Sequence, residues 1–189
     1  MNISHKQLFR ILYHPVTYTH DSHLPHAWQG DEQIDALLLN YWLHAHYKLT
    51  HLPEAWSASD PVMTTIMQQW YRLPNIAHLL GGYLLKSSMA STRLTLFSDP
   101  QLLNFIALPM AHHIDIVPLK HGTYTTQACG AAFILSQCNS IPPALHQRFM
   151  LLFPVDVVLP KMQAPRTPDH INLFNMATHY ANCFPGRAA

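Results

Sequence analysis

Hydrophobic positions recur at three- and four-residue spacing over much of this chain of 189 residues, a pattern typical of amphipathic α-helices. The clearest example begins at Asp60-Pro61. This pair is a helix start signal, because the carboxylate can accept from free backbone N–H groups and proline has a suitable φ. The apolar residues that follow on one helical face are Val62, Met63, Ile66, Met67 and Trp70. We expect this helix to end near Leu73, since Pro74 disfavours helical conformation in the residue before it.

Pro74 can in turn begin a second helix, from Asn75 to about Ala90. Its apolar residues are Ile76, Leu79, Leu80, Tyr83, Leu84 and Leu85. This set is too wide for a surface stripe, so we expect a central helix that is covered on most sides. Gly81 and Gly82 in its middle each cost about 1 kcal/mol relative to alanine. We therefore expect another element to pack directly against the bare backbone, and we interpret residues 60–91 as a central pair of core helices.

The same capping and periodicity signals predict the other helices. These are expected at residues 4–13, 31–49, 99–108, 126–137, 140–154 and 167–184. Asp31 is expected to cap the second of them. Its inward-facing residues would be Ile34, Leu37, Leu38, Tyr41, Trp42 and Ala45. Asp99-Pro100 and Thr167-Pro168 repeat the cap-then-proline signal.

Between the helices the sequence predicts loops and little else. Residues 15–30 are expected to form an ordered loop that Tyr18, Leu24 and Trp28 hold in place. Alternating residues at 92–97 indicate a strand that would need residues 114–117 as its partner. The tail at residues 185–189 is expected to fray. The predicted fold is mostly α: a single compact helical domain over residues 1–189, with about seven helices and at most one minor β-ribbon.

Composition favours a protein that associates with other proteins. Charged residues make up 11% of the chain, against roughly 25% in an average soluble domain. The net charge is +1 with histidines neutral, so no strong field exists to attract nucleic acid, and no basic patch with interleaved aromatic residues is present. A surface with so little charge tends to associate, which favours a subunit over a freely diffusing enzyme.

The lack of targeting signals and the spacing of the cysteines predict a cytoplasmic protein. No apolar run approaches the roughly 20 residues that cross a bilayer, so we expect no direct membrane insertion. The first residues lack the apolar region of a secretory signal. Cys129, Cys138 and Cys183 are odd in number and have no C-x-x-C spacing. We therefore expect no disulfide framework and a reducing cytoplasm.

Histidine is the conspicuous residue, with 15 copies. Its densest cluster is His20, His23 and His26, with Asp21 between them. Three imidazoles and a carboxylate are zinc-ligand types, but their spacing matches no structural zinc pattern and no cysteine pair lies nearby. We therefore expect solvated or packing histidines and no tightly bound zinc, with a metal site as the alternative.

The sequence contains no catalytic motif and only a few candidate partner-binding residues. The chain has no G-x-S-x-G elbow and no phosphate-binding glycine loop. Asp31, Asp60, Asp99 and Asp169 are explained as helix caps. We therefore expect neither an enzyme nor a cofactor. The candidate partner-binding residues are Tyr71, Arg72 and Arg148. Each is expected to be exposed, and a solvated or intramolecularly paired residue is the alternative for each.

Three stretches of the chain resemble a known family, in the family's order. They are ILYHPVTYTHDSHL at 11–24, WYRLPNIAHLLGGYLL at 70–85 and PALHQRFMLLFP at 143–154. The second is the most specific, being similar to a Trp-x-x-Leu-Pro signature followed by an Ala-x-Leu-Leu-Gly helix. The family is the type III secretion adaptor family usually called SctK, in the branch that includes OrgA and MxiK. Residues 86–140 match poorly.

The resemblance implies a function that composition and spacing do not. It implies a cytoplasmic adaptor at the inner membrane that belongs to the sorting platform of an injectisome. Such an adaptor links the cytoplasmic domain of the SctD-type ring protein to the pod made of the SctQ-type protein. Two alternatives remain open: a histidine-dependent metal-binding protein, and a chaperone for one secreted substrate. Bound metal would favour the first, and binding to an unfolded segment the second.

Overall fold

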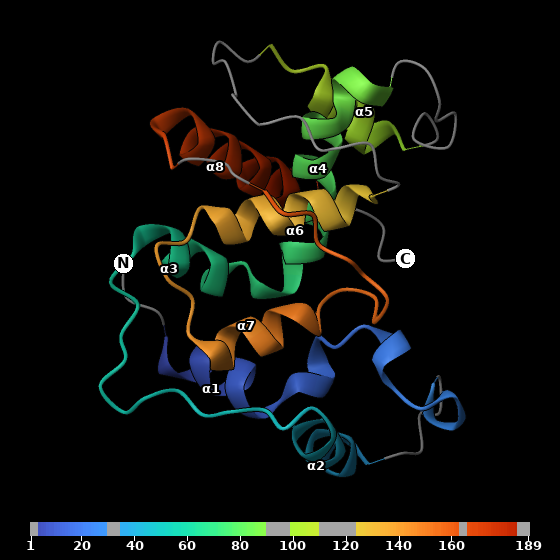
Figure 1. The fold of residues 1–189 in the computed structure, drawn as a ribbon, viewed down its shortest axis with the longest axis vertical. Helices are drawn as coiled ribbons and strands as arrows, with labels where there is room; N and C mark the ends of the chain where they lie inside the picture. The colour runs from blue at the N-terminus through green and yellow to red at the C-terminus, as the bar shows by residue number, and fades with distance from the viewer. Residues whose placement is uncertain (1–3, 30–34, 90–98, 110–123, 163–165, 185–189) are drawn as a thin grey trace. The chain divides into compact units, whose positions relative to one another are not determined.

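The chain folds into α-helices joined by loops and short 3₁₀ turns in the computed structural model (Figure 1). The structure describes residues 4–29, 35–89, 99–109, 124–162 and 166–184. These residues contain eight α-helices and no strand, so the prediction of a mostly α fold is confirmed. The strand and its partner expected at residues 92–97 and 114–117 lie outside the described residues, as does the tail.

Contacts between residues divide the chain into two compact units. The first comprises Met1–Tyr71 and Ser140–Val157, and the second comprises Arg72–Asn139 and Val158–Ala189. The division separates the two helices of the expected central pair: α3 (Pro61–Gln68) belongs to the first unit and α4 (Leu73–Met89) to the second. The single domain over residues 1–189 stays a prediction.

The first unit is built on α1 (His5–Tyr13), which contacts both α3 and α7 (Pro143–Met150). Its wholly buried side chains include Ile11, Leu43, Ile66, Met67, Leu145, Phe149 and Phe153. Trp70 is also wholly buried and presents its ring at a steep angle to Tyr18 and Phe149, with centroid distances of 5.7 and 6.5 Å. The apolar face predicted for residues 62–70 is therefore confirmed as core.

The end of α3 differs from the prediction. Asp60 caps the helix, accepting from the backbone N–H of Val62 at 3.0 Å, as expected. The α-helix ends at Gln68, however, and Trp70–Arg72 form a 3₁₀ turn before α4 begins at Leu73. Pro74 lies in the first turn of α4, where the missing N–H has no intrahelical acceptor to lose.

The prediction for α2 (Ala36–His46) was wrong about which side faces inward. Leu37, Leu38 and Tyr41 are 70%, 52% and 74% exposed. Ala45 is exposed as well, and Trp42 is partly buried. The buried residues of α2 are Leu39, Asn40 and Leu43. Asp31 and Ile34 lie outside the described residues, and the observed cap is Asp35, which accepts from the Leu37 N–H at 2.8 Å.

A buried polar residue lies on the inward side of α2. Asn40 is buried, and its side-chain oxygen accepts from the backbone N–H of Val16 at 3.0 Å. This bond satisfies a backbone donor at the 3₁₀ turn Pro15–Thr17, which packs against α2. Since α2 carries apolar residues on several sides, periodicity alone did not identify the side that faces inward.

Residues 15–29, after α1, are ordered, as expected, but they are not irregular. They contain three 3₁₀ turns, Pro15–Thr17, Asp21–His23 and His26–Trp28. Tyr18 is buried, and its hydroxyl donates to the carbonyl of Ile11 at 2.7 Å. Leu24 and Trp28, the other two expected anchors, are partly buried.

The second unit is organised around α4, which contacts three other helices (Figure 1). These are α5 (Pro100–Ile106), α6 (Thr126–Ser136) and α8 (Pro168–Cys183). Two of the predicted caps are present: Asp99 accepts from two backbone N–H groups of α5, and Thr167 accepts from that of His170. The central position predicted for the helix after Pro74 is confirmed.

Two glycines allow α4 and α6 to pack backbone against backbone. A Cβ atom on Gly81 of α4 would lie 1.8 Å from the carbonyl oxygen of Thr126, and one on Gly130 of α6 would lie 1.8 Å from that of Ala77. At Gly82 the obstacle would instead be a side chain, that of Leu102 at 2.3 Å. The expected packing of another element against the bare backbone of α4 is confirmed. The packing is reciprocal, because α6 also presents a glycine, Gly130, to the backbone of α4.

Replacing Gly81 with alanine should lower the free energy of unfolding by about 2–3 kcal/mol, because a backbone carbonyl must move. This loss should exceed the roughly 1 kcal/mol that alanine contributes through helix propensity. Gly82→Ala is the matched control, since it gains the same propensity and displaces only a side chain. Urea titration of both variants measures the difference. Equal stability of the two variants would contradict backbone contact at Gly81.

Candidate interaction surfaces

The histidine cluster of the first unit does not converge. His23 is buried, with Nδ1 2.9 Å from the Tyr47 hydroxyl and Nε2 2.8 Å from the carbonyl oxygen of Phe153. His20 instead accepts from the backbone N–H of Ser22, and His26 is exposed. Over the described ranges, no three His, Cys, Asp or Glu residues are placed to hold a metal ion. That the cluster binds no zinc tightly stays a prediction.

Burial favours the neutral form of His23. A carbonyl oxygen only accepts, so we assign the ring proton to Nε2, which leaves Nδ1 to accept from Tyr47. Burial lowers the pKa of His23, and the bond to the Phe153 carbonyl opposes that shift in part. Burial also lowers the pKa of His44, as does the nearby positive charge of Arg148. In both imidazoles the fold therefore shifts the equilibrium toward the neutral form.

The free energy of unfolding should decrease as the pH falls below about 6.5, the ordinary pKa of histidine. The unfolded chain takes up protons there that folded His23 and His44 resist, so their contribution is complete above that pH and is lost on acidification. Urea titrations at about pH 7.5 and about pH 5.5 measure the change. His23→Gln, which cannot titrate, should show a smaller decrease. An unchanged pH dependence in this variant would contradict the assignment to His23.

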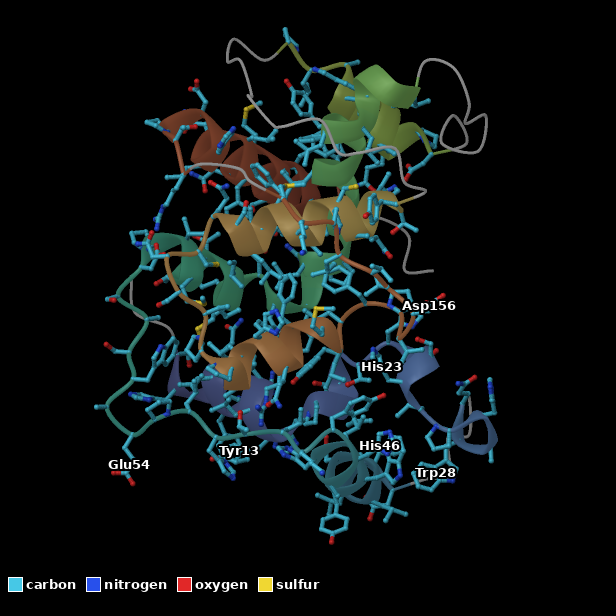
Figure 2. The ribbon with its side chains drawn as sticks, in the orientation of Figure 1. Tyr13, His23, Trp28, His46, Glu54 and Asp156 are labelled. Atoms are coloured by element: carbon cyan, nitrogen blue, oxygen red, sulfur yellow. The ribbon has the colours of Figure 1, made fainter. Side chains whose placement is uncertain are left out.

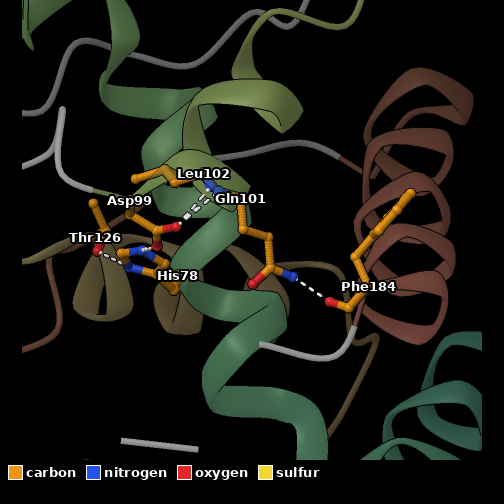
Figure 3. A network of polar contacts seen from close by, with 6 residues as sticks. All are labelled: His78, Asp99, Gln101, Leu102, Thr126 and Phe184. Atoms are coloured by element: carbon orange, nitrogen blue, oxygen red, sulfur yellow. Dashed lines mark hydrogen bonds and ion pairs between the residues drawn. The ribbon is translucent and has the colours of Figure 1, made fainter. Parts of the chain in front are cut away.

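A polar network in the second unit joins the ends of three helices, α5, α6 and α8, to the middle of α4 (Figure 3). His78 on α4 lies 2.6 Å from the Thr126 hydroxyl through Nδ1 and 3.0 Å from the Asp99 carboxylate through Nε2. Asp99 also accepts from the N–H groups that begin α5. Next to it, the Gln101 side chain donates to the carbonyl of Phe184 at the end of α8.

Threonine, histidine and aspartate in one chain of hydrogen bonds resemble a nucleophile–base–acid set. The surroundings assign this network another role. Thr126 is buried at the first turn of α6, and its carbonyl lies against Gly81. The other oxygen of the Asp99 carboxylate caps α5. The network therefore holds the starts of α5 and α6 against α4.

The expectation of an exposed Arg148 was wrong, because its side chain is wholly buried. The guanidinium makes four hydrogen bonds, each to a backbone carbonyl: two to Leu12, one to Thr50 and one to Ala144. Leu12 lies in the last turn of α1, where carbonyls lack intrahelical partners and a positive charge is favourable. Burial lowers the pKa of Arg148. Arg148 thus joins α1, α7 and the segment after α2.

The other two candidates are at the surface. Tyr71 is 44% exposed, and its hydroxyl lies 3.3 Å from that of Thr17. Arg72 is exposed and donates to the side chain of Asn182. A partner-binding role for either residue stays a prediction.

Sequence patterns missed an exposed apolar surface on α2. We call it the α2 face and define it by Leu37, Leu38 and Tyr41, which are all more than half exposed. Trp28 and His46 are labelled beside α2 in Figure 2, and both contact Trp42: His46 stacks on it at 4.5 Å, and Trp28 meets it at a steep angle at 5.6 Å. Apolar side chains exposed together in this way are typical of a protein interface.

Each unit also has a surface hollow. The α1 hollow, in the first unit, is lined by Lys6, Phe9, Arg10, His14, Thr17 and Tyr71. The α8 hollow, in the second unit, is lined by Leu108, Asn172, Asn175, Met176, His179 and Tyr180. The α1 hollow contains two positively charged residues, whereas the α8 hollow contains amide, apolar and aromatic side chains.

No helix in the described parts of the chain has both the length and the apolar character needed to cross a membrane.

Comparison with known proteins identifies the family. No curated protein and no solved structure matches the chain. Residues 8–183 match the family described as "Bacterial type III secretion apparatus protein (OrgA_MxiK)". The match includes all three stretches that carry the resemblance, and it confirms that resemblance. The chain belongs to the OrgA/MxiK family of bacterial type III secretion apparatus proteins.

Proposed function

We propose that this protein is a non-enzymatic adaptor of a type III secretion apparatus. It acts at the cytoplasmic face of the inner membrane, where it links the cytoplasmic domain of the SctD-type ring protein to the SctQ-type pod protein. Secretion depends on this link. The observation that carries the proposal is the family match over residues 8–183.

The distribution of exposed surface supports two separate binding sites. The first unit carries the α2 face and the α1 hollow, and the second carries the α8 hollow. The α2 face consists of two leucines and a tyrosine, so contact there depends on apolar burial. Tyrosine is also among the residues enriched in binding hot spots.

The low charge of the chain suggests how the complexes respond to salt. Only 11% of the residues are charged, and none of the three residues that define the α2 face is charged. Interfaces that depend on shape and apolar contact lose little affinity as the salt concentration rises. Complexes that form through attraction between oppositely charged surfaces lose much more.

Replacing Leu37 and Tyr41 together with serine should weaken binding of one partner by about 10-fold or more and leave the other unchanged. Met176→Ser in the α8 hollow should show the opposite selectivity. The measurement is a pull-down with the ring protein's cytoplasmic domain and the pod protein, separately and together. Thermal melts of each variant show whether the fold is retained.

Val155→Ser is the matched control, because Val155 is also apolar and exposed in the first unit but lies outside both surfaces. This variant should bind both partners normally. If the folded wild-type protein binds neither partner, even with both present, the adaptor function is wrong.

A further inference from the structure

We propose that the α1 hollow binds an acidic segment of a partner protein, one that presents carboxylates next to a bulky apolar side chain. This inference rests on the proposed adaptor function and adds the chemistry of one of its contacts.

Charge is the first reason. Lys6 and Arg10 are both exposed and lie four residues apart on α1, so they share one helix face. The only other Lys or Arg among the described residues of the first unit are Lys48 and the buried Arg148. No carboxylate lines the hollow. Two of the three surface cations of the described first unit therefore lie at a single site, and they favour an anionic ligand.

Apolar surface is the second reason. Phe9 lies between the two cations in sequence and is 55% exposed, and Tyr71 contributes a second exposed aromatic ring. Phe9 also contacts the rings of Tyr13 and His14, at centroid distances of 4.9 and 5.6 Å. Aromatic residues and arginine are the residue types enriched at protein interfaces. A ligand with charge alone would leave these rings uncovered, whereas a peptide segment can cover them with an apolar side chain.

The hollow is also preformed. Gln7 donates through its side-chain amide to the carbonyls of Met67 and Gln68, which holds α1 against the end of α3. Thr17 donates to the carbonyl of His14 at 2.8 Å, and its oxygen lies 3.3 Å from the Tyr71 hydroxyl. The hollow is open to solvent and has a volume of about 670 Å³, enough for several side chains of a partner. A site whose walls are already held in place avoids part of the entropy lost on binding.

An anionic membrane is the main rival ligand. Recognition of anionic lipid by a helix typically uses a cluster of about four to eight Lys or Arg residues. The α1 hollow has two, Lys6 and Arg10, and it places them around aromatic side chains. These features favour a protein segment.

The test reverses the charges of the hollow. We expect the double variant Lys6→Glu/Arg10→Glu to weaken binding of either the ring protein's cytoplasmic domain or the pod protein by about 10-fold or more at about 150 mM salt. The remaining binding should be less sensitive to salt. Phe9→Ser should weaken binding of the same partner. Lys48→Glu is the matched control, an exposed cation of the same unit outside the hollow, and should leave binding unchanged.

Carbodiimide cross-linking identifies the ligand chemistry directly, since it joins an amine to a carboxylate in contact with it. Mass spectrometry should find Lys6 joined to an Asp or Glu of the affected partner, and this product should be absent with Lys6→Gln. If both partners bind the double variant as they bind the wild type, the inference is wrong and the adaptor function stands. It is also wrong if charge reversal abolishes binding only to vesicles containing phosphatidylserine. Failure of wild-type protein to bind either partner would instead reject the adaptor function itself.

Discussion

Replacing Trp70 with alanine should lower the free energy of unfolding by about 3–5 kcal/mol. The indole is wholly buried in the first unit, and its ring contacts those of Tyr18 and Phe149 at steep angles. Truncation therefore removes a large apolar surface and leaves a cavity that fixed helices cannot fill. Urea titration of wild type and variant measures the loss.

The matched control for this change is Tyr71→Ala, the neighbouring aromatic residue, which is substantially exposed. It should change stability much less. Trp70→Phe should retain part of the ring packing and fall between the wild type and Trp70→Ala. A Trp70→Ala protein that unfolds like the wild type but binds its partners poorly would mean that Trp70 acts at an interface and not in the core.

Replacing Arg148 with methionine should lower the free energy of unfolding by about 3 kcal/mol or more, because hydrogen bonds from a charged donor contribute about 1.5–3 kcal/mol each. The change keeps much of the apolar length of the side chain. It leaves the carbonyls of Leu12 and Thr50 without the guanidinium that joins them. Chemical denaturation of the variant measures the effect.

Arg148→Lys should recover only part of that loss, because an ammonium group cannot reproduce the planar arrangement of donors. Arg10→Met is the surface control, since Arg10 is exposed, and it should be nearly neutral for stability. If Arg148→Met proved as stable as Arg10→Met while losing a partner, Arg148 would be a contact residue, as the sequence had suggested.

Helix starts were predictable because their signals are local. A carboxylate or hydroxyl and a proline at adjacent positions satisfy the first N–H groups and preset φ, whatever the rest of the chain does. Asp60, Asp99 and Thr167 cap their helices as predicted. The end of α3 was less predictable, since the last turn of a helix readily becomes a 3₁₀ turn.

The candidate binding surfaces were not predictable from the same patterns. The prediction of an exposed Arg148 rests on a position opposite the apolar ridge of Leu145, Phe149 and Leu152. Three of the four hydrogen bonds of Arg148 go to residues that are distant in sequence, and the closest approach, 2.8 Å, is to Leu12 and Thr50. The α1 hollow likewise combines Tyr71 with residues 6–17, a combination that no local spacing indicates.

By itself, the sequence determined the helical class, the caps of α3, α5 and α8 and the need for a close neighbour at Gly81, because these follow from short-range hydrogen bonding and side-chain size. Only the tertiary structure decided which neighbour that was, Thr126, and which side of α2 faces inward. The reason is that burial depends on partners from distant segments. On the inward side of α2, Leu39 and Leu43 are buried and Asn40 accepts from the backbone of Val16, whereas Leu37 and Tyr41 lie at the surface.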